Sequence, residues 1–216
     1  MTREQPFQRA RQPEQINMRR AQLLAAAAEL FDEQGPSGAG LNAIAARAGF
    51  TKSNVYRYFE SREQVLLELF LAEFAELADA MAGAIGAAQG GDMAALAAAI
   101  TTTFVDRPRC CQLIAILSST LEQNVSEETI AATKTQMNDH SARIVTALAA
   151  QLPGTARHDC AWVIAMTGSL LAGMWPNVNP PPAARAVLAR PEFANLRVDL
   201  PRDLNRATQA LLAAIT

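Results

Sequence analysis

The stretch LNAIAARAGFTKSNVYRYFESREQVLLELF, residues 41–70, decides the fold of this chain. Its apolar residues from Leu41 onward recur at the three-and-four spacing of a helix face, which predicts a helix over residues 41–48. Gly49 follows, and glycine readily adopts the positive φ that ends a helix in a tight turn. Small Ala45 allows the next helix to cross close to the first. The pattern predicts a helix-turn-helix motif.

The second half of the motif is a short polar helix predicted over residues 52–58, with Thr51 as its N-cap. Val55 and Phe59 face inward at helical spacing, so the other side chains point away from the core. A polar helix face is usually only solvated, but two tyrosines beside an arginine on so short a helix favour a contact surface. Asn, Lys and Arg side chains read base edges, and hydroxyl groups reach phosphates. This face is therefore predicted to bind DNA.

The ordered series AAAAELFDEQG, IAARAG, TKSNVYRYF and SRE resembles the DNA-binding domain of the tetracycline-repressor (TetR/AcrR) family of bacterial transcription regulators. The resemblance extends over residues 19–71. It implies an all-α protein with an N-terminal three-helix helix-turn-helix domain and a C-terminal helical domain for ligand binding and dimerisation. The chain departs from the family pattern at Gly40, where a phosphate-binding Ser or Thr is usual and Asn42 is the substitute, and at Arg62, where Lys is usual.

The resemblance also implies which side chains meet DNA. One group of residues is expected to contact bases or the phosphates beside them. A second group is expected to contact the DNA backbone. The first group is Thr51, Lys52, Ser53, Asn54 and Arg57, and the second is Tyr56, Tyr58 and Arg62, with Asn42 added in place of the missing hydroxyl.

Composition, a helix-capping motif and the distribution of charge divide the sequence into three parts. Residues 1–18 are predicted to form a flexible arm, in which Arg9 and Arg11 either reach a minor groove or stay solvated. Residues 19–60 form the predicted DNA-binding domain, and a capping box that begins at Ser61 opens the helical domain, residues 61–216. The net charge is +3 up to residue 62 and −5 beyond it, for a total of −2. This distribution of charge suits a basic DNA-binding domain joined to an acidic helical domain.

Two later helices are predicted to form a homodimer. Residues 161–175 are almost free of charge, too short to span a membrane, and apolar on nearly all sides, so this helix must be covered on nearly all sides. A stripe that begins at Leu204 and Thr208 marks a second helix over residues 201–215. A dimer through the helices near 160–175 and 201–215 reads a pseudo-palindromic operator. No signal peptide is predicted, because no apolar segment follows the early arginines.

A set of apolar residues at helical spacing, with one histidine beside them, is either ordinary core or the lining of an effector pocket. Met and aromatic side chains suit an adaptable apolar cavity, so a mostly apolar small molecule is the expected effector. No cofactor is predicted. The set consists of Phe104, Leu113, Ile116, Met137, His140, Trp162 and Met166.

The three cysteines, Cys110, Cys111 and Cys160, form no disulfide framework and indicate a reducing, cytoplasmic location. They are either small buried apolar residues or, with Arg107 and Arg109 nearby, a thiol-based redox or electrophile sensor. No metal site is predicted, because the sequence shows no suitable ligand spacing.

The sequence thus predicts a DNA-binding transcriptional regulator, a repressor that an apolar effector releases from its operator. An enzyme is not expected, since neither a phosphate loop nor a serine elbow nor a paired-His motif is present. A helical adaptor that uses its exposed tyrosines for protein contacts is the remaining alternative. Salt separates the two, because DNA binding through phosphates weakens steeply with ionic strength.

Overall fold

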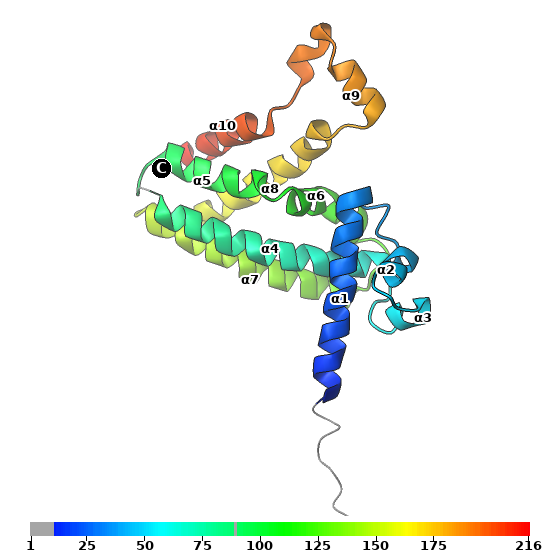
Figure 1. The fold of residues 1–216 in the computed structure, drawn as a ribbon. Coiled ribbons are helices and arrows are strands. Elements are labelled where there is room, and N and C mark those ends of the chain that lie inside the picture. The colour runs from blue at the N-terminus through cyan, green and yellow to red at the C-terminus, as the bar shows by residue number, and fades with distance from the viewer. Residues whose placement is uncertain (1–10, 89) are drawn as a thin grey trace, which may run out of the picture.

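The computed structural model describes residues 11–88 and 90–216, and within these ranges the chain is all-α, as predicted (Figure 1). The elements are α1 (Arg11–Gln34), α2 (Leu41–Arg47), α3 (Lys52–Val55), α4 (Arg62–Ala87), α5 (Met93–Val105), α6 (Pro108–Ile116), the π-helical turn η1 (Leu117–Leu121), α7 (Glu127–Gln151), α8 (Arg157–Val178), α9 (Pro182–Leu188), the 3-10 helix η2 (Pro191–Leu196) and α10 (Leu200–Ala213).

The N-terminal part is the predicted helix-turn-helix. Helices α1 to α3 and the first turns of α4 enclose an apolar core whose largest buried side chains include Phe31, Phe59 and Phe70. Gly49 makes the turn between α2 and α3 with a φ of +73°, as its sequence position predicts. We call this unit the reader.

The second reader helix is shorter than predicted. Residues 52–58 were expected to be helical, but α3 ends at Val55 and the chain continues as a turn. In that turn the N–H groups of Tyr58 and Phe59 both donate to the carbonyl of Val55, at 2.9 and 3.0 Å. Val55 and Phe59 are anchored in the core at either end of the turn, so the turn brings the chain back to the core after a single helical turn.

The predicted arm, residues 1–18, also differs from the structure over part of its length. Helix α1 begins at Arg11, so residues 11–18 are helical, while Arg9 lies outside the described residues. Gln, Glu, Met and Arg are strong helix formers, so they extend α1 beyond the core even though residues 14–19 are exposed.

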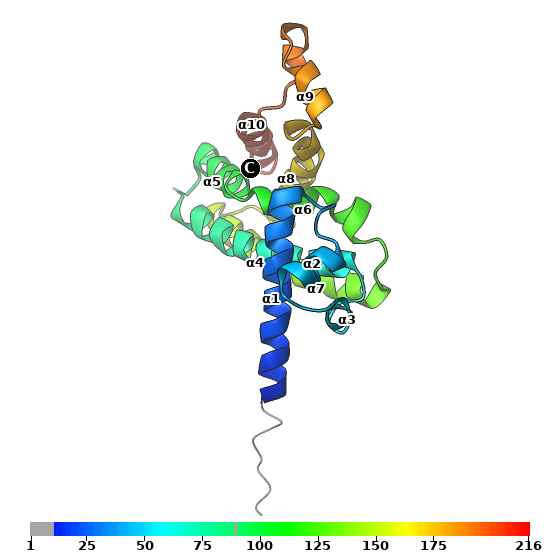
Figure 2. The same cartoon turned by 45° about the vertical axis from the view of Figure 1, so that its right-hand side comes forward.

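The C-terminal part, which we call the body, is built around α4. Helix α7 packs along α4 side by side, and α8 crosses them beside α6, with α5 and α10 at the opposite end from the reader (Figures 1 and 2). Helix α4 belongs to both units: its start is buried in the reader core, whereas Leu77, Met81 and Ile85 lie in the body core.

The α6–η1 segment joins reader and body a second time. Leu113, Leu117 and Leu121 are buried in the reader core, while Cys110 and Cys111 of the same segment lie in the body core. The segment switches from α-helix to a π-helical turn at Leu117, a departure that often marks a functional position.

Helix α10 turns its apolar stripe inward. Leu204 and Thr208 are fully buried against α5 and α8 of the same protomer, so they are unavailable to a second subunit. Its outward face instead carries Arg206, Ala210 and Ala213. Over the described residues no helix is long and apolar enough to cross a membrane.

Candidate nucleic-acid interface

Residues 51–58 present the polar face that the sequence predicts. Thr51, Lys52, Ser53, Tyr56 and Arg57 are exposed, and Asn54 and Tyr58 are half-buried. Thr51 has the extended backbone of an N-cap, but its side chain makes no capping hydrogen bond. Among the described residues, no hydrogen bond or ion pair engages the side chains of Lys52, Asn54 or Arg57. These groups are therefore free to meet a ligand.

Lys52 and Tyr56 form a small basic and aromatic unit on this surface. The Lys52 Nζ atom lies 5.7 Å from the centroid of the Tyr56 ring, within the range of a cation–π contact. The tyrosine is 52% exposed. An ammonium group beside an exposed phenol offers a charge to a phosphate and a hydroxyl to its neighbour.

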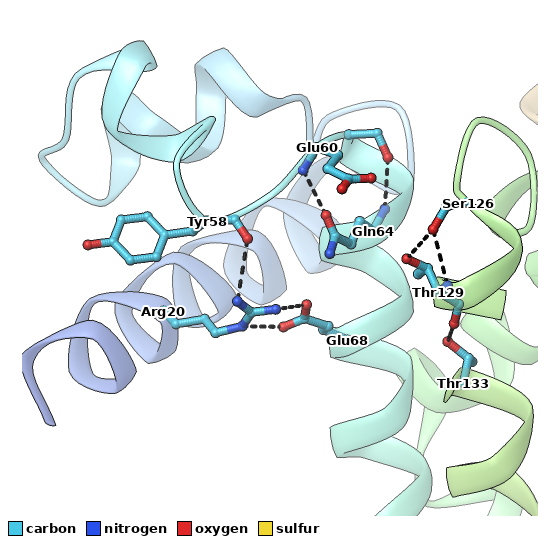
Figure 3. A network of polar contacts seen from close by, with 9 residues as sticks. Arg20, Tyr58, Glu60, Gln64, Glu68, Ser126, Thr129 and Thr133 are labelled. Carbon is cyan, nitrogen blue, oxygen red and sulfur yellow. Dashed lines mark hydrogen bonds and ion pairs between the residues drawn. The ribbon is translucent and has the colours of Figure 1, made fainter. Parts of the chain in front are cut away.

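Arg20 of α1 holds the back of this surface, and sequence reasoning missed it. Its Nε atom donates to Glu68 Oε2 at 2.7 Å, and its Nη1 atom donates to the Tyr58 carbonyl at 3.4 Å (Figure 3). The guanidinium also lies 4.8 Å from the centroid of the Phe59 ring. Helical spacing could have identified Arg20, because it stands seven residues before buried Ala27 and so lies on the apolar face of α1.

The start of α4 is fixed by the predicted capping box. The N–H of Gln64 donates to Ser61 Oγ at 3.1 Å, and the N–H of Glu60 donates to Gln64 Oε1 at 2.7 Å (Figure 3). The first bond is that of the predicted capping box, whereas the second goes to Glu60, one residue before the N-cap. Together they fix where the chain enters α4 after the turn at residues 56–58, which we call the recognition turn.

Two arginines near the surface of residues 51–58 already form ion pairs within the chain. Arg47 binds both Glu29 and Glu33, and its hydrogen bond lowers the pKa of the Glu33 carboxyl. Arg62 pairs with Glu63 at 2.7 Å, so a phosphate has to compete with that carboxylate.

The first turn of α2 holds the remaining predicted contact. Gly40 is its N-cap and provides no side-chain hydrogen bond, while Asn42 of this turn is exposed.

A second candidate site is a pocket of about 460 Å³ in the body, which opens to the surface beside the exposed residues Asn138 and Ser169. It lies between α4, α5, the α6–η1 segment, α7 and α8, and its walls are aromatic and aliphatic, including Phe70, Phe74 and Phe104. Its polar groups are neutral: Ser118, Asn138, Ser141 and Ser169. Such a lining accepts an uncharged, largely apolar molecule that carries a hydrogen-bonding group, because an unpaired charge is costly to bury there.

Two of the seven predicted pocket residues, Phe104 and Met137, line this cavity. The other five lie elsewhere. Leu113 and Ile116 pack against the reader core, since the twist of α6 turns them toward α1 and α4. His140 does not line the cavity but lies close to it, with its ring centroid 6.3 Å from that of the cavity residue Phe74 and its Nδ1 atom 2.5 Å from Arg143.

Trp162 and Met166 lie on the outward side of α8, where the tryptophan is 43% exposed. The residues of α8 that line the cavity are small instead: Ala161, Ala165, Gly168, Ser169 and Ala172, together with Ile164. These small side chains leave room for the cavity.

The three cysteines are buried. Burial raises the pKa of the Cys110 thiol and raises that of Cys111 to about 12, so both remain protonated. Cys111 Sγ donates to the Phe104 carbonyl at 3.1 Å. These environments are those of inert structural thiols and do not favour the sensor alternative. Within the described residues, no cluster of His, Cys, Asp and Glu is arranged to hold a metal ion.

Arg109, at the start of α6, ties the body to the reader. It donates to Asp32 of α1 at 2.7 Å and to Glu73 of α4 at 2.8 Å. The next turns of the same segment supply Ile114, Leu117 and Ser118 to the cavity. The cavity wall and the reader contact are thus parts of one continuous segment.

Comparison with known families assigns both parts of the chain. Residues 23–69 match the family described as bacterial regulatory proteins, tetR family, and residues 71–215 match the family described as tetracyclin repressor-like, C-terminal domain. Over 54 residues the chain is 48% identical to the HTH-type transcriptional activator FasR of Mycolicibacterium smegmatis. That alignment spans 25% of this chain and 23% of that protein.

Solved structures share the fold over nearly the whole chain. The fatty acid degradation regulator FadR from Bacillus halodurans is similar with a TM-score of 0.59 and 16% identity, over 99% of this chain and 98% of that one. SmeT, the repressor of the Stenotrophomonas maltophilia multidrug efflux pump SmeDEF, is similar with a TM-score of 0.54 and 21% identity, over 90% and 89% of the two chains.

Proposed function

Because the chain belongs to the TetR family and is a DNA-binding transcriptional regulator, we propose that it is a homodimeric repressor released from its operator by an uncharged, mostly apolar effector. The observation that carries the proposal is a connection between two sites. The chain has a polar surface at residues 51–58 and an uncharged cavity, and the α6–η1 segment contacts both the reader core and the cavity. A reducing, cytoplasmic setting suits both its DNA target and its three free thiols.

The reading surface has a division of labour. Asn54 and Arg57 contact bases or adjoining phosphates together with Thr51, Lys52 and Ser53, since Asn and Arg make the paired hydrogen bonds that distinguish adenine and guanine. The DNA backbone is held by Tyr56, Tyr58 and Arg62, with Asn42 at the start of α2. Phosphate contacts fix the register of the reader, and base contacts give it specificity.

The dimer forms through the outward faces of α8 and α10. Trp162 and Leu170 are 43% and 38% exposed on α8 and, with half-buried Met166 between them, form an apolar stripe; a contiguous exposed apolar patch is typical of a protein–protein interface. On α10 the face beside them is small and partly polar, as at Arg206 and Ala210. A two-fold arrangement of these helices presents two readers to a pseudo-palindromic operator.

The effector acts through the α6–η1 segment. A ligand in the cavity presses on Ile114 and Leu117, while the same segment holds the reader through Leu113 and Arg109. A ligand that binds better to the splayed dimer lowers operator affinity by its preference for that form. Repression follows when the unliganded dimer occupies the operator.

Activation is the second candidate. The DNA-binding part of the chain is similar to FasR, which is named an activator, whereas SmeT is named a repressor. A reporter gene behind the operator separates the two, because loss of the regulator raises expression under repression and lowers it under activation.

Fluorescence anisotropy of a labelled duplex across a salt gradient tests the DNA-binding step. We expect the logarithm of the affinity to fall linearly with the logarithm of salt concentration, by about 0.9 for each phosphate neutralised. Binding that ignores salt, or no binding to duplex DNA at low salt, contradicts the proposal and favours an adaptor.

A further inference from the structure

A cleft of about 580 Å³ lies where the reader meets the body, between the last turn of α1, the start of α6 and the end of α8 (Figures 1 and 2). We call it the junction cleft. Among the described residues, none lines both this cleft and the apolar cavity of the body. Asp32 comes to the cleft from α1 of the reader, and Trp175 comes from α8 of the body. A molecule bound here therefore touches both units.

The walls of the junction cleft carry charges of both signs. Three carboxylates and two guanidiniums line it, a net charge of −1: Asp32, Glu73, Asp106, Arg107 and Arg109. Arg109 stands between two of the carboxylates, with hydrogen bonds of 2.7 Å to Asp32 and 2.8 Å to Glu73. A free anion meets three carboxylates in this cleft, and a free cation meets two guanidiniums. The cleft therefore favours a polar ligand without net charge.

Several polar side chains of the cleft have hydrogen-bonding capacity left over. Within the described residues, the guanidinium of Arg107 donates only to the Thr103 carbonyl, at 3.1 Å, and Asp106 forms no ion pair. The half-buried amide of Gln112 has no hydrogen-bond partner in the described part of the chain either. Carboxylates accept hydrogen bonds, guanidiniums donate them, and amides do both. A ligand hydroxyl can use all three kinds of neighbour, because it carries one donor and two acceptor lone pairs.

Trp175 gives the cleft one flat apolar wall. The indole is half-buried, packs against the body core and also lines the cleft. The C–H groups on one side of a sugar ring form an apolar face of similar size, while the hydroxyl groups project from the edge of the ring. An aromatic ring beside both donors and acceptors therefore matches a sugar better than it matches a wholly apolar molecule.

We propose that the junction cleft binds a neutral sugar of one or two rings, whose hydroxyl groups bond to Asp106, Arg107 and Gln112 and whose apolar face packs on Trp175. The volume of the cleft falls within the range of about 300–1,000 Å³ that is usual for small-molecule sites. The sugar differs in class from the apolar effector of the proposed function, so the protein has two separate small-molecule sites. The cleft also contains Arg109, which links reader and body, so the sugar binds beside that link.

Intrinsic fluorescence of the full chain tests the site, because the chain has two tryptophans and Trp162 does not line the cleft. The variant Trp162→Phe leaves Trp175 as the only tryptophan, and Trp175→Phe leaves Trp162. Both variants are titrated with glucose, galactose, maltose and lactose. We expect a saturable change in the emission of Trp162→Phe with at least one of these sugars, and no change in Trp175→Phe.

The proposed contacts are tested by further substitutions in the Trp162→Phe background. Gln112→Ala and Arg107→Met are each expected to raise the Kd for the sugar about tenfold, because each removes hydrogen bonds to a bound hydroxyl group. Arg190→Met changes an exposed arginine outside the cleft and is the matched control, with a Kd expected to stay within about twofold. Circular dichroism of each variant confirms that it is folded.

The sugar site is overturned if no sugar of the panel changes the emission of Trp175, or if Gln112→Ala and Arg107→Met bind sugar as the control does. Inorganic phosphate and tetramethylammonium chloride are titrated in parallel. A response of Trp175 to either ion without a response to sugar also overturns the proposal, and shows that the cleft selects a charged ligand. These results are independent of operator binding, which the anisotropy titration measures separately.

Discussion

The guanidinium of Arg20 joins α1 to α4 through Glu68, with its Nε atom 2.7 Å from Glu68 Oε2, behind the proposed DNA-binding segment. The same group donates to the Tyr58 carbonyl, at the end of the recognition turn. One side chain thus sets the position of that turn relative to two helices.

Replacing Arg20 with methionine is expected to weaken binding to all duplexes about tenfold and to destabilise the protein by about 1–3 kcal/mol. The cause is that Glu68, whose side chain is only 22% exposed, loses its partner while the recognition turn loses its anchor. Anisotropy and thermal unfolding measure the two effects. Arg19→Met, at an exposed neighbouring position, is the control for unfolding. An Arg20→Met protein that melts and binds as the wild type contradicts the anchoring role.

Base contacts and phosphate contacts should respond differently to substitution. Asn54→Ala is expected to relax the preference at one operator position by about 1–3 kcal/mol and to leave binding to unrelated DNA nearly unchanged. Lys52→Ala is expected to weaken binding to all sequences and to reduce the salt slope by about 1. Titration of operator and scrambled duplexes measures both. The same uniform loss in the two variants excludes this division of roles.

Filling the cavity should block the effector without disturbing the reader. Gly168 lines the cavity, and a Cβ atom there meets open space, so Gly168→Leu is expected to prevent binding of Nile red, an uncharged dye, and to leave operator affinity within about twofold. Fluorescence titration measures the dye. Gly83→Leu is the matched control, because this α4 glycine is exposed and has the same space around it. Equal dye binding by both variants places the ligand elsewhere.

The thiols should be slow to react in the folded protein. With the pKa of Cys111 raised to about 12, only about one thiol in ten thousand is ionised at pH 8, and all three cysteines are buried. Ellman's reagent is therefore expected to titrate three thiols in guanidinium chloride and none within minutes under native conditions. A thiol that reacts rapidly in the native protein, with loss of operator binding, revives the sensor alternative.

Local sequence patterns predicted the reader well because its signals are local. Gly49 at a positive φ and the Ser61 N-cap depend only on neighbours in the chain, and both are confirmed, although the return bond of Gln64 goes to Glu60 and not to Ser61. The length of the recognition helix was wrong, because after Val55 the N–H groups of Arg57 and Tyr58 donate three residues back, to Asn54 and Val55, and the chain tightens into a turn.

The cavity was harder to predict because it depends on packing between distant helices. Helical periodicity places Leu113 on the apolar face of its helix, but only the tertiary arrangement decides whether that face meets the cavity or the reader core. Arg20 was missed for the same reason, since its partner Glu68 is 48 residues away. The small α8 residues such as Gly168 likewise acquire their role only when α7 and α4 form the opposite wall.

Selection of bound sequences from random duplex DNA tests the central claim most directly, namely that residues 51–58 of two protomers read one operator. We expect an enriched pseudo-palindrome whose half-sites lie about one helical turn apart or a multiple of it, and one altered position in each half-site for Asn54→Ala. No enrichment by the folded wild-type protein, or a selected site without two-fold symmetry, contradicts the account.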